Sequence, residues 1–149
     1  MTRIELSTEI NAPIERCFDL ARSIDLHMAS ADQTDERAIA GRTSGLIELG
    51  ETVTWSARHF GIRQTLTSKI VGFDRPLSFT DVMVAGAFKS FRHDHLFHAI
   101  GDRTVMTDVF VFESPFGILG KFVDVLVLRR YMTRFLERRN RAIKTAAEA

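Results

Sequence analysis

The segment FKSFRHDHLFHAI, residues 88–100, holds three of the chain's five histidines within six positions. Its alternation of apolar and polar residues predicts a β-strand, in which every second side chain points to the same side. His93 and His95 then share one face of the strand, and His98 lies on the opposite face with the charged residues. Since charged side chains favour solvent, we expect His93 and His95 to point into the protein.

His93 and His95 could bind a metal ion or transfer protons. Side chains two residues apart on a strand lie about 6.5–7 Å apart, so the two imidazoles could meet at one ion. His59, Asp81 or Asp108 could complete such a set, which would have the composition of a catalytic zinc or iron site. An imidazole also titrates near neutral pH, and a neighbouring carboxylate would raise its pKa. Because H-x-H alone is a weak metal signal, we favour histidines that line a pocket and hydrogen-bond to Asp81 or Asp108, and we expect no cofactor.

Five segments with strand periodicity contain or surround these residues. They are rich in valine, threonine, isoleucine and aromatic residues, and short turn signals separate them, which is typical of an antiparallel meander. The five segments are ETVTWSARHF (51–60), IRQTLTSKIVGF (62–73), LSFTDVMV (77–84), FKSFRHDHLFHAI (88–100) and TVMTDVFVF (104–112). A sheet with one apolar face must bury that face against another element.

The chain before the meander predicts a strand and two short helices. Residues 3–10 alternate as a strand, and Asn11 and Pro13 suit the start of a helix. Helical spacing continues into a second short helix over residues 24–28. The stretch DERAIAG, residues 35–41, is a candidate for a brief further strand.

After the meander the periodicity becomes helical. Ser114 and Pro115 suit the start of a helix, but Gly117 and Gly120 weaken its first turn, so the long helix is expected to begin near Lys121. Its apolar stripe consists of Leu119, Phe122, Leu126, Met132, Phe135, Leu136 and Ile143. No other long amphipathic element is available to cover the sheet. We therefore predict an α+β fold in which a curved antiparallel sheet wraps around a long C-terminal helix, with two short helices after the first strand.

Three stretches of the chain carry a family resemblance. They are INAPIERCFDLARSIDLH (10–27), the meander that opens with GLIELGETVTWSARHFGI (45–100), and SPFGILGKFVDVLVLRRYMTRFLERRN (114–140). In this order they resemble the START-like, or helix-grip, superfamily, and especially its small bacterial SRPBCC members of the polyketide cyclase/dehydrase-like kind. The resemblance covers essentially the whole chain, residues 1–149, as one START-like ligand-binding domain. It implies a cavity between the sheet and the long helix that holds an apolar or amphipathic small molecule, and it transfers no catalytic motif.

The alternation along each strand predicts which side chains would face that cavity. The expected apolar contacts are Trp55, Phe79, Met83, Phe91, Phe97 and Tyr131. The expected polar contacts, which would orient the polar end of a ligand, are His59, Asp81, His93 and His95.

Composition and charge argue against several classes of protein. The chain has 149 residues, 45% of them apolar, and a net charge of +1, so no overall charge attracts it to nucleic acid. No apolar run approaches the roughly 18 residues of a membrane helix. Cys17 is the only cysteine, which excludes an internal disulfide. The first residues do not resemble a secretory signal, so a cytoplasmic location is expected.

Basic residues gather on the predicted last helix. Arg130, Arg134, Arg138 and Arg141 follow one another at helical spacing and share one face. A solvated face opposite the apolar stripe is the favoured interpretation, because positive charge is also favourable towards a helix C-terminus. An anionic partner is the alternative.

Three functions therefore stay open. The favoured one is binding of a small hydrophobic or amphipathic molecule in the cavity. The second is an enzyme of the cyclase or dehydratase type whose catalytic acid/base group is formed by His93, His95 and Asp81. The third is a protein-interaction module that uses the basic helix face. A homodimer stays open as well, whereas nucleic acid and an integral membrane position are not expected.

Overall fold

The computed structural model describes residues 1–114 and 127–149. Its strands are β1 (Thr2–Ile10), β2 (Arg37–Gly41), β3 (Thr52–His59), β4 (Ile62–Asp74), β5 (Ser78–Gly86), β6 (Ser90–Ile100) and β7 (Arg103–Glu113). Its helices are α1 (Ile14–Ala21), α2 (Ile24–Ser30), the 3-10 turn η1 (Asp32–Thr34) and α4 (Arg129–Glu148). The strands and the two short helices lie where the sequence patterns predict them.

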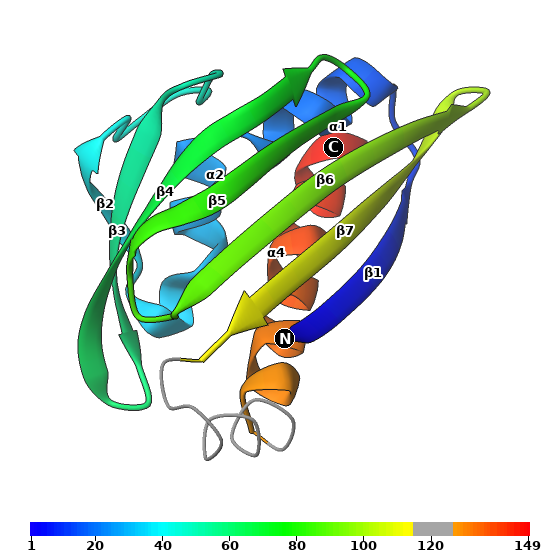
Figure 1. Cartoon of the computed structure of the whole chain (residues 1–149). Coiled ribbons are helices and arrows are strands. Elements are labelled where there is room, and N and C mark those ends of the chain that lie inside the picture. The colour runs from blue at the N-terminus through cyan, green and yellow to red at the C-terminus, as the bar shows by residue number, and fades with distance from the viewer. Residues whose placement is uncertain (115–126) are drawn as a thin grey trace.

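The seven strands form one antiparallel sheet in the order β1-β7-β6-β5-β4-β3-β2. Strands β3 to β7 make the predicted meander, while β1 pairs with β7 at one edge and β2 pairs with β3 at the other. Figure 1 shows a curved sheet with α1, α2 and α4 on the same side of it. The predicted α+β helix-grip fold is thereby confirmed.

Buried aromatic side chains join the helices to the sheet. Phe18 of α1 is fully buried, and the centroid of its ring lies 5.3 Å from those of Phe73, Phe79 and Phe97 in edge-on contacts. Leu136 of α4 packs into a second buried cluster with aromatic residues of β6 and β7. Burying one large apolar side chain stabilises a fold by about 1.5–3 kcal/mol, so these contacts hold both helices against the sheet.

The start of α1 differs from the prediction. Asn11 is not the N-cap, because Pro13 occupies that position and makes no side-chain capping hydrogen bond. The backbone N–H of Asn11 donates instead to Oε2 of Glu148, at 2.8 Å. This bond ties the turn between β1 and α1 to the last turn of α4. The second helix does have a side-chain cap, since Oγ of Ser23 accepts from the backbone N–H of Leu26 at 3.2 Å.

The long C-terminal helix is described from Arg129 onward. Its predicted start near Lys121, together with Pro115 and the two glycines between them, lies outside the described residues. Within residues 1–114 and 127–149, no helix combines the length and the apolar character that crossing a membrane requires.

Candidate functional site

A cavity of about 510 Å³ lies between the sheet and α4. Most of its wall is apolar or aromatic, and the polar side chains that reach it come from β3 to β6, from α2 and α4, and from the segments on either side of α2. Eight of the ten predicted contact residues line it: Trp55, His59, Phe79, Asp81, Phe91, His93, His95 and Tyr131. Two lining residues, Phe60 and Val127, are 57% and 48% exposed, so this end of the cavity lies next to the molecular surface.

Met83 and Phe97 are the two predicted contacts that do not line the cavity. Phe97 points inward as predicted, but α1 covers this end of β6, and the ring packs against Phe18. Met83 is partly buried and packs against the cluster that contains Phe91. Both side chains therefore belong to the packed interior beside the cavity.

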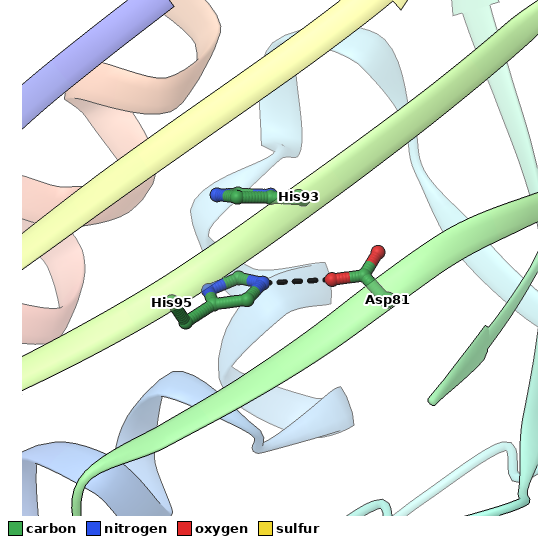
Figure 2. Close-up of side chains that lie close together, drawn as sticks. All are labelled: Asp81, His93 and His95. Carbon is green, nitrogen blue, oxygen red and sulfur yellow. Dashed lines mark hydrogen bonds and ion pairs between the residues drawn. The ribbon is translucent and has the colours of Figure 1, made fainter. Parts of the chain in front are cut away.

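The inward faces of β5, β6 and β7 bring four ionisable side chains together. In the strand register, Asp81 of β5 lies opposite His93 of β6, and His95 lies opposite Asp108 of β7. The hydrogen bonds run along the diagonals: Nε2 of His93 is 2.7 Å from Oδ1 of Asp108, and Nε2 of His95 is 2.7 Å from Oδ1 of Asp81. The two imidazole rings are stacked (Figure 2). Their centroids are 3.7 Å apart. With Arg139 and Asn140 of α4, these residues form what we call the sheet polar cluster.

His95 is held as a neutral imidazole. Its Nδ1 accepts a hydrogen bond from Nη2 of Arg139 at 3.2 Å, and a guanidinium can only donate, so the proton of the ring is on Nε2 and is donated to Asp81. Burial, followed by the positive charges of His93 and Arg139, lowers the pKa of His95 well below its ordinary value. The expected net rise in the pKa of this imidazole is therefore wrong: Asp108 does raise the pKa, but burial and the charges around the ring outweigh that effect.

Asp108 is the buried anion of the cluster. Its side chain is fully buried and accepts hydrogen bonds from His93, from Nδ2 of Asn140 at 2.7 Å and from Nη1 of Arg139 at 3.3 Å. Burial alone would raise the pKa of Asp108, but the hydrogen bond from His93 and the charges of His93 and Arg139 lower it well below the usual range. Asp108 and Arg139 thus form a buried ion pair whose remaining hydrogen-bonding positions are largely occupied.

Asp81 is the carboxyl group that faces the cavity. Its side chain is 16% exposed, and its Oδ1 accepts a hydrogen bond from Nε2 of His95. Burial raises the pKa of Asp81, although the charges of His93 and Arg139 act in the opposite direction. Asp81 and Asp108 are chemically identical side chains on β5 and β7, with β6 between them, and their surroundings move their pKa values in opposite directions. Asp81 is therefore the residue of the cluster best placed to exchange a proton with a bound molecule.

The cluster also contains a set of potential metal ligands. One ligand atom from each of Asp81, His93 and His95 lies within 4.8 Å of the others, whereas His59, the predicted third histidine, is not part of that group. Nε2 of both clustered histidines is hydrogen-bonded to a carboxylate, and Nδ1 of His95 accepts from Arg139. A metal ion would have to replace these bonds beside a guanidinium cation, so the arrangement suits a polar group of an organic molecule better than a metal.

A second group of polar residues, which we call the edge polar cluster, lines the cavity near β2 and β3. Nε2 of His27 is 2.7 Å from Oε1 of Glu36, and the His27 ring lies over Trp55 with centroids 4.3 Å apart. Nδ1 of His59 is hydrogen-bonded to the hydroxyl of Tyr131. Burial lowers the pKa of His59 and raises that of Tyr131, which keeps both side chains neutral at neutral pH. The sheet polar cluster and the edge polar cluster therefore both contribute polar groups to the cavity wall.

Sequence reasoning missed four residues of these clusters: His27, Glu36, Arg139 and Asn140. A signal for Arg139 was present, because it lies three residues after Leu136 and four before Ile143 and therefore on the apolar stripe of the helix. Because Arg139 lies within a run of basic residues, it was not recognised as part of the buried face. The sequence does not show how α2 and the start of β2 pack beside β3. For that reason His27 and Glu36 were not predicted as cavity residues.

Comparisons with known proteins agree with the architecture. A family model described as "Polyketide cyclase / dehydrase and lipid transport" matches residues 1–148. The structure resembles that of the protein TTHA0849 from Thermus thermophilus, with a TM-score of 0.75, 17% sequence identity, and coverage of 98% of this chain and 99% of that one. It also resembles ginseng major latex-like protein 151 from Panax ginseng, with a TM-score of 0.72, 17% identity, and coverage of 99% and 98%.

A START superfamily protein from Mycobacterium smegmatis is similar as well, with a TM-score of 0.74, 12% identity, and coverage of 98% of this chain and 97% of that one. No curated protein matches the sequence. At these identities the structural likeness concerns the fold and not the ligand or the reaction.

Proposed function

The chain belongs to the polyketide cyclase/dehydrase and lipid transport family, and from that premise we propose that it binds a small hydrophobic or amphipathic molecule in the cavity between the sheet and α4. The observation that carries the proposal is the cavity itself. Its volume of about 510 Å³ falls within the range of roughly 300–1,000 Å³ that is usual for small-molecule sites. An aromatic wall with a few convergent polar groups is also the usual form of such a site.

The two ends of the proposed ligand would meet different surroundings. Its apolar body would contact Trp55, Phe79 and Phe91, which are buried and line the cavity. A polar group would meet Asp81 and His95, where a carboxyl and a neutral imidazole are already aligned by hydrogen bonds. Such preorganised groups bind at a lower cost in side-chain entropy than mobile ones.

Mass spectrometry of freshly purified and then denatured protein tests the proposal. We expect a stoichiometric small apolar molecule to be released. The emptied protein should then bind the neutral fluorescent probe N-phenyl-1-naphthylamine with one site per chain. The proposal would be contradicted if no molecule were released and the protein also failed to bind the probe saturably.

The pair formed by Asp81 and His95 supports a second candidate, an enzyme of the cyclase or dehydratase type. A carboxyl group whose pKa is raised by burial can give a proton to a leaving hydroxyl group of a bound molecule, and His95 would hold its position. Comparing the molecules released from the wild type and from Asp81→Asn tests this candidate. A dehydrated or cyclised product in the wild type and its precursor in the variant would support turnover, and the same molecule in both would exclude a role of Asp81 in chemistry.

A further inference from the structure

Three arginines of α4 line a groove next to the cavity. Arg130, Arg134 and Arg138 are exposed and follow one another every four residues, so they form a row along the helix. With Val127, Tyr131 and Phe135 they enclose a groove of about 350 Å³, which we call the arginine groove. The row extends for about 12 Å, at 1.5 Å per residue.

The three guanidinium groups have no acidic partner among the described residues. Six other arginines with exposed side chains each form an ion pair with Asp or Glu, whereas the exposed Arg16, Arg58, Arg129 and Arg141 also have no ion pair within the described residues. The six paired arginines are Arg3, Arg37, Arg63, Arg75, Arg92 and Arg103. The positive charge of the groove is therefore not neutralised by the part of the chain that the structure describes, although the whole protein has a net charge of only +1.

The groove and the cavity share part of their walls. Val127, Tyr131 and Phe135 line both of them. The Tyr131 ring faces Phe60, with centroids 4.6 Å apart, and both rings lie at the end of the cavity that is next to the surface. A molecule with its apolar body in the cavity could therefore place its end group in the groove by passing these aromatic side chains.

We propose that the arginine groove is an anion subsite, and that the ligand of the cavity is an amphiphile whose carboxylate, sulfate or phosphate group binds Arg130, Arg134 and Arg138. This inference rests on the proposed binding function. Guanidinium groups match the geometry of these oxyanions and hold them with charge-assisted hydrogen bonds. The anionic group belongs to the cavity ligand and not to a membrane surface, because the arginines enclose a concave groove whose wall continues into the cavity.

Two probes with the same tail and different head groups test the proposal. Decanoate and decanol are titrated at neutral pH against the complex of the protein with N-phenyl-1-naphthylamine, and displacement of the dye is measured. The wild type is expected to bind decanoate about ten-fold more tightly than decanol, because three exposed cations each contribute a modest attraction. Added salt should weaken the binding of decanoate and leave that of decanol unchanged.

The variant R130Q/R134Q/R138Q is expected to lose the preference for decanoate and to bind decanol as the wild type does. Arg141→Gln is the control, since Arg141 is an exposed arginine of the same helix that has no acidic partner among the described residues and does not line the groove. Arg141→Gln should keep the preference. A thermal unfolding curve unchanged from the wild type checks that the triple variant is folded.

Other outcomes overturn the inference in distinguishable ways. If the dye and decanol bind but the triple variant keeps the preference for decanoate, the anion subsite is wrong and the proposed binding function stands. If neither the dye nor either probe binds, both proposals fail. If vesicles that contain phosphatidylglycerol bind the wild type but not the triple variant, and decanoate shows no preference, then the row of arginines faces a membrane.

Discussion

The hydrogen bonds of the sheet polar cluster depend on which ring nitrogen of His95 carries the proton. Because Arg139 donates to Nδ1 of His95, the imidazole is neutral and presents its Nε2 proton to Asp81. The guanidinium group also balances the charge of Asp108, which is fully buried. One arginine therefore determines the tautomer of the histidine beside the cavity and compensates the buried anion behind it.

Asp108→Asn is expected to lower the free energy of unfolding by about 3 kcal/mol at neutral pH, because Arg139 would be left buried without its anion. Since the pKa of Asp108 is lowered in the folded protein, its contribution to stability is present above the unfolded value of about 3.9 and is lost as the pH falls below it. Urea unfolding over a pH series should show a steeper acid loss in the wild type than in the variant. Asp94→Asn, on the outer face of β6, is the control and should cost less than about 1 kcal/mol.

Asp81→Asn is expected to have the opposite effect. The pKa of Asp81 is raised in the folded protein, so the folded state loses stability as the pH rises through that pKa. An amide oxygen can still accept from His95 and carries no charge to bury. The variant should therefore be about 1 kcal/mol more stable than the wild type at neutral pH, and the difference should vanish in acid. A stability difference that grows in acid would contradict the direction of the shift.

At the scale of elements, the periodicity of the sequence was sufficient to predict the strands, the two short helices and the inward face of β6. It was sufficient because one buried face per strand imposes a period of two, and His93 and His95 followed that period. It could not predict which histidine meets which aspartate, since the pairing depends on the register of β5, β6 and β7. The capping of α1 was also predicted incorrectly, because the helix begins at Ile14 with Pro13 as its N-cap, two residues after Asn11.

The inward face of strand β6 has two parts: one end belongs to the packed core, and the other end lines the cavity. Phe97 packs under α1, whereas Phe91 lines the cavity. Phe97→Leu should therefore lower the free energy of unfolding by about 1–2 kcal/mol without changing the affinity for N-phenyl-1-naphthylamine. Phe91→Leu should change that affinity several-fold. Fluorescence titration together with urea unfolding measures both, and a loss of dye affinity in Phe97→Leu alone would contradict this division of the strand.

At the scale of the whole molecule, the fold leaves a space of about 510 Å³ beside its core. Atoms that line such a space lack part of the packing contacts that other interior atoms have, so an occupant is expected to stabilise the protein. At a free concentration of about one hundred times its Kd, a ligand of the folded state adds about 2.7 kcal/mol to the free energy of unfolding. Binding and stability should therefore change together in this protein.

Ala57→Met tests that coupling, because Ala57 is buried in β3 and lines the cavity. The flexible methionine side chain should fill part of the space and raise the stability of the emptied protein by about 1 kcal/mol. It should also remove most of the rise in melting temperature that saturating N-phenyl-1-naphthylamine produces in the wild type. Ala99→Met, at an exposed position of β6, should leave that rise intact. An equal rise in Ala57→Met and the wild type would place the dye outside the cavity.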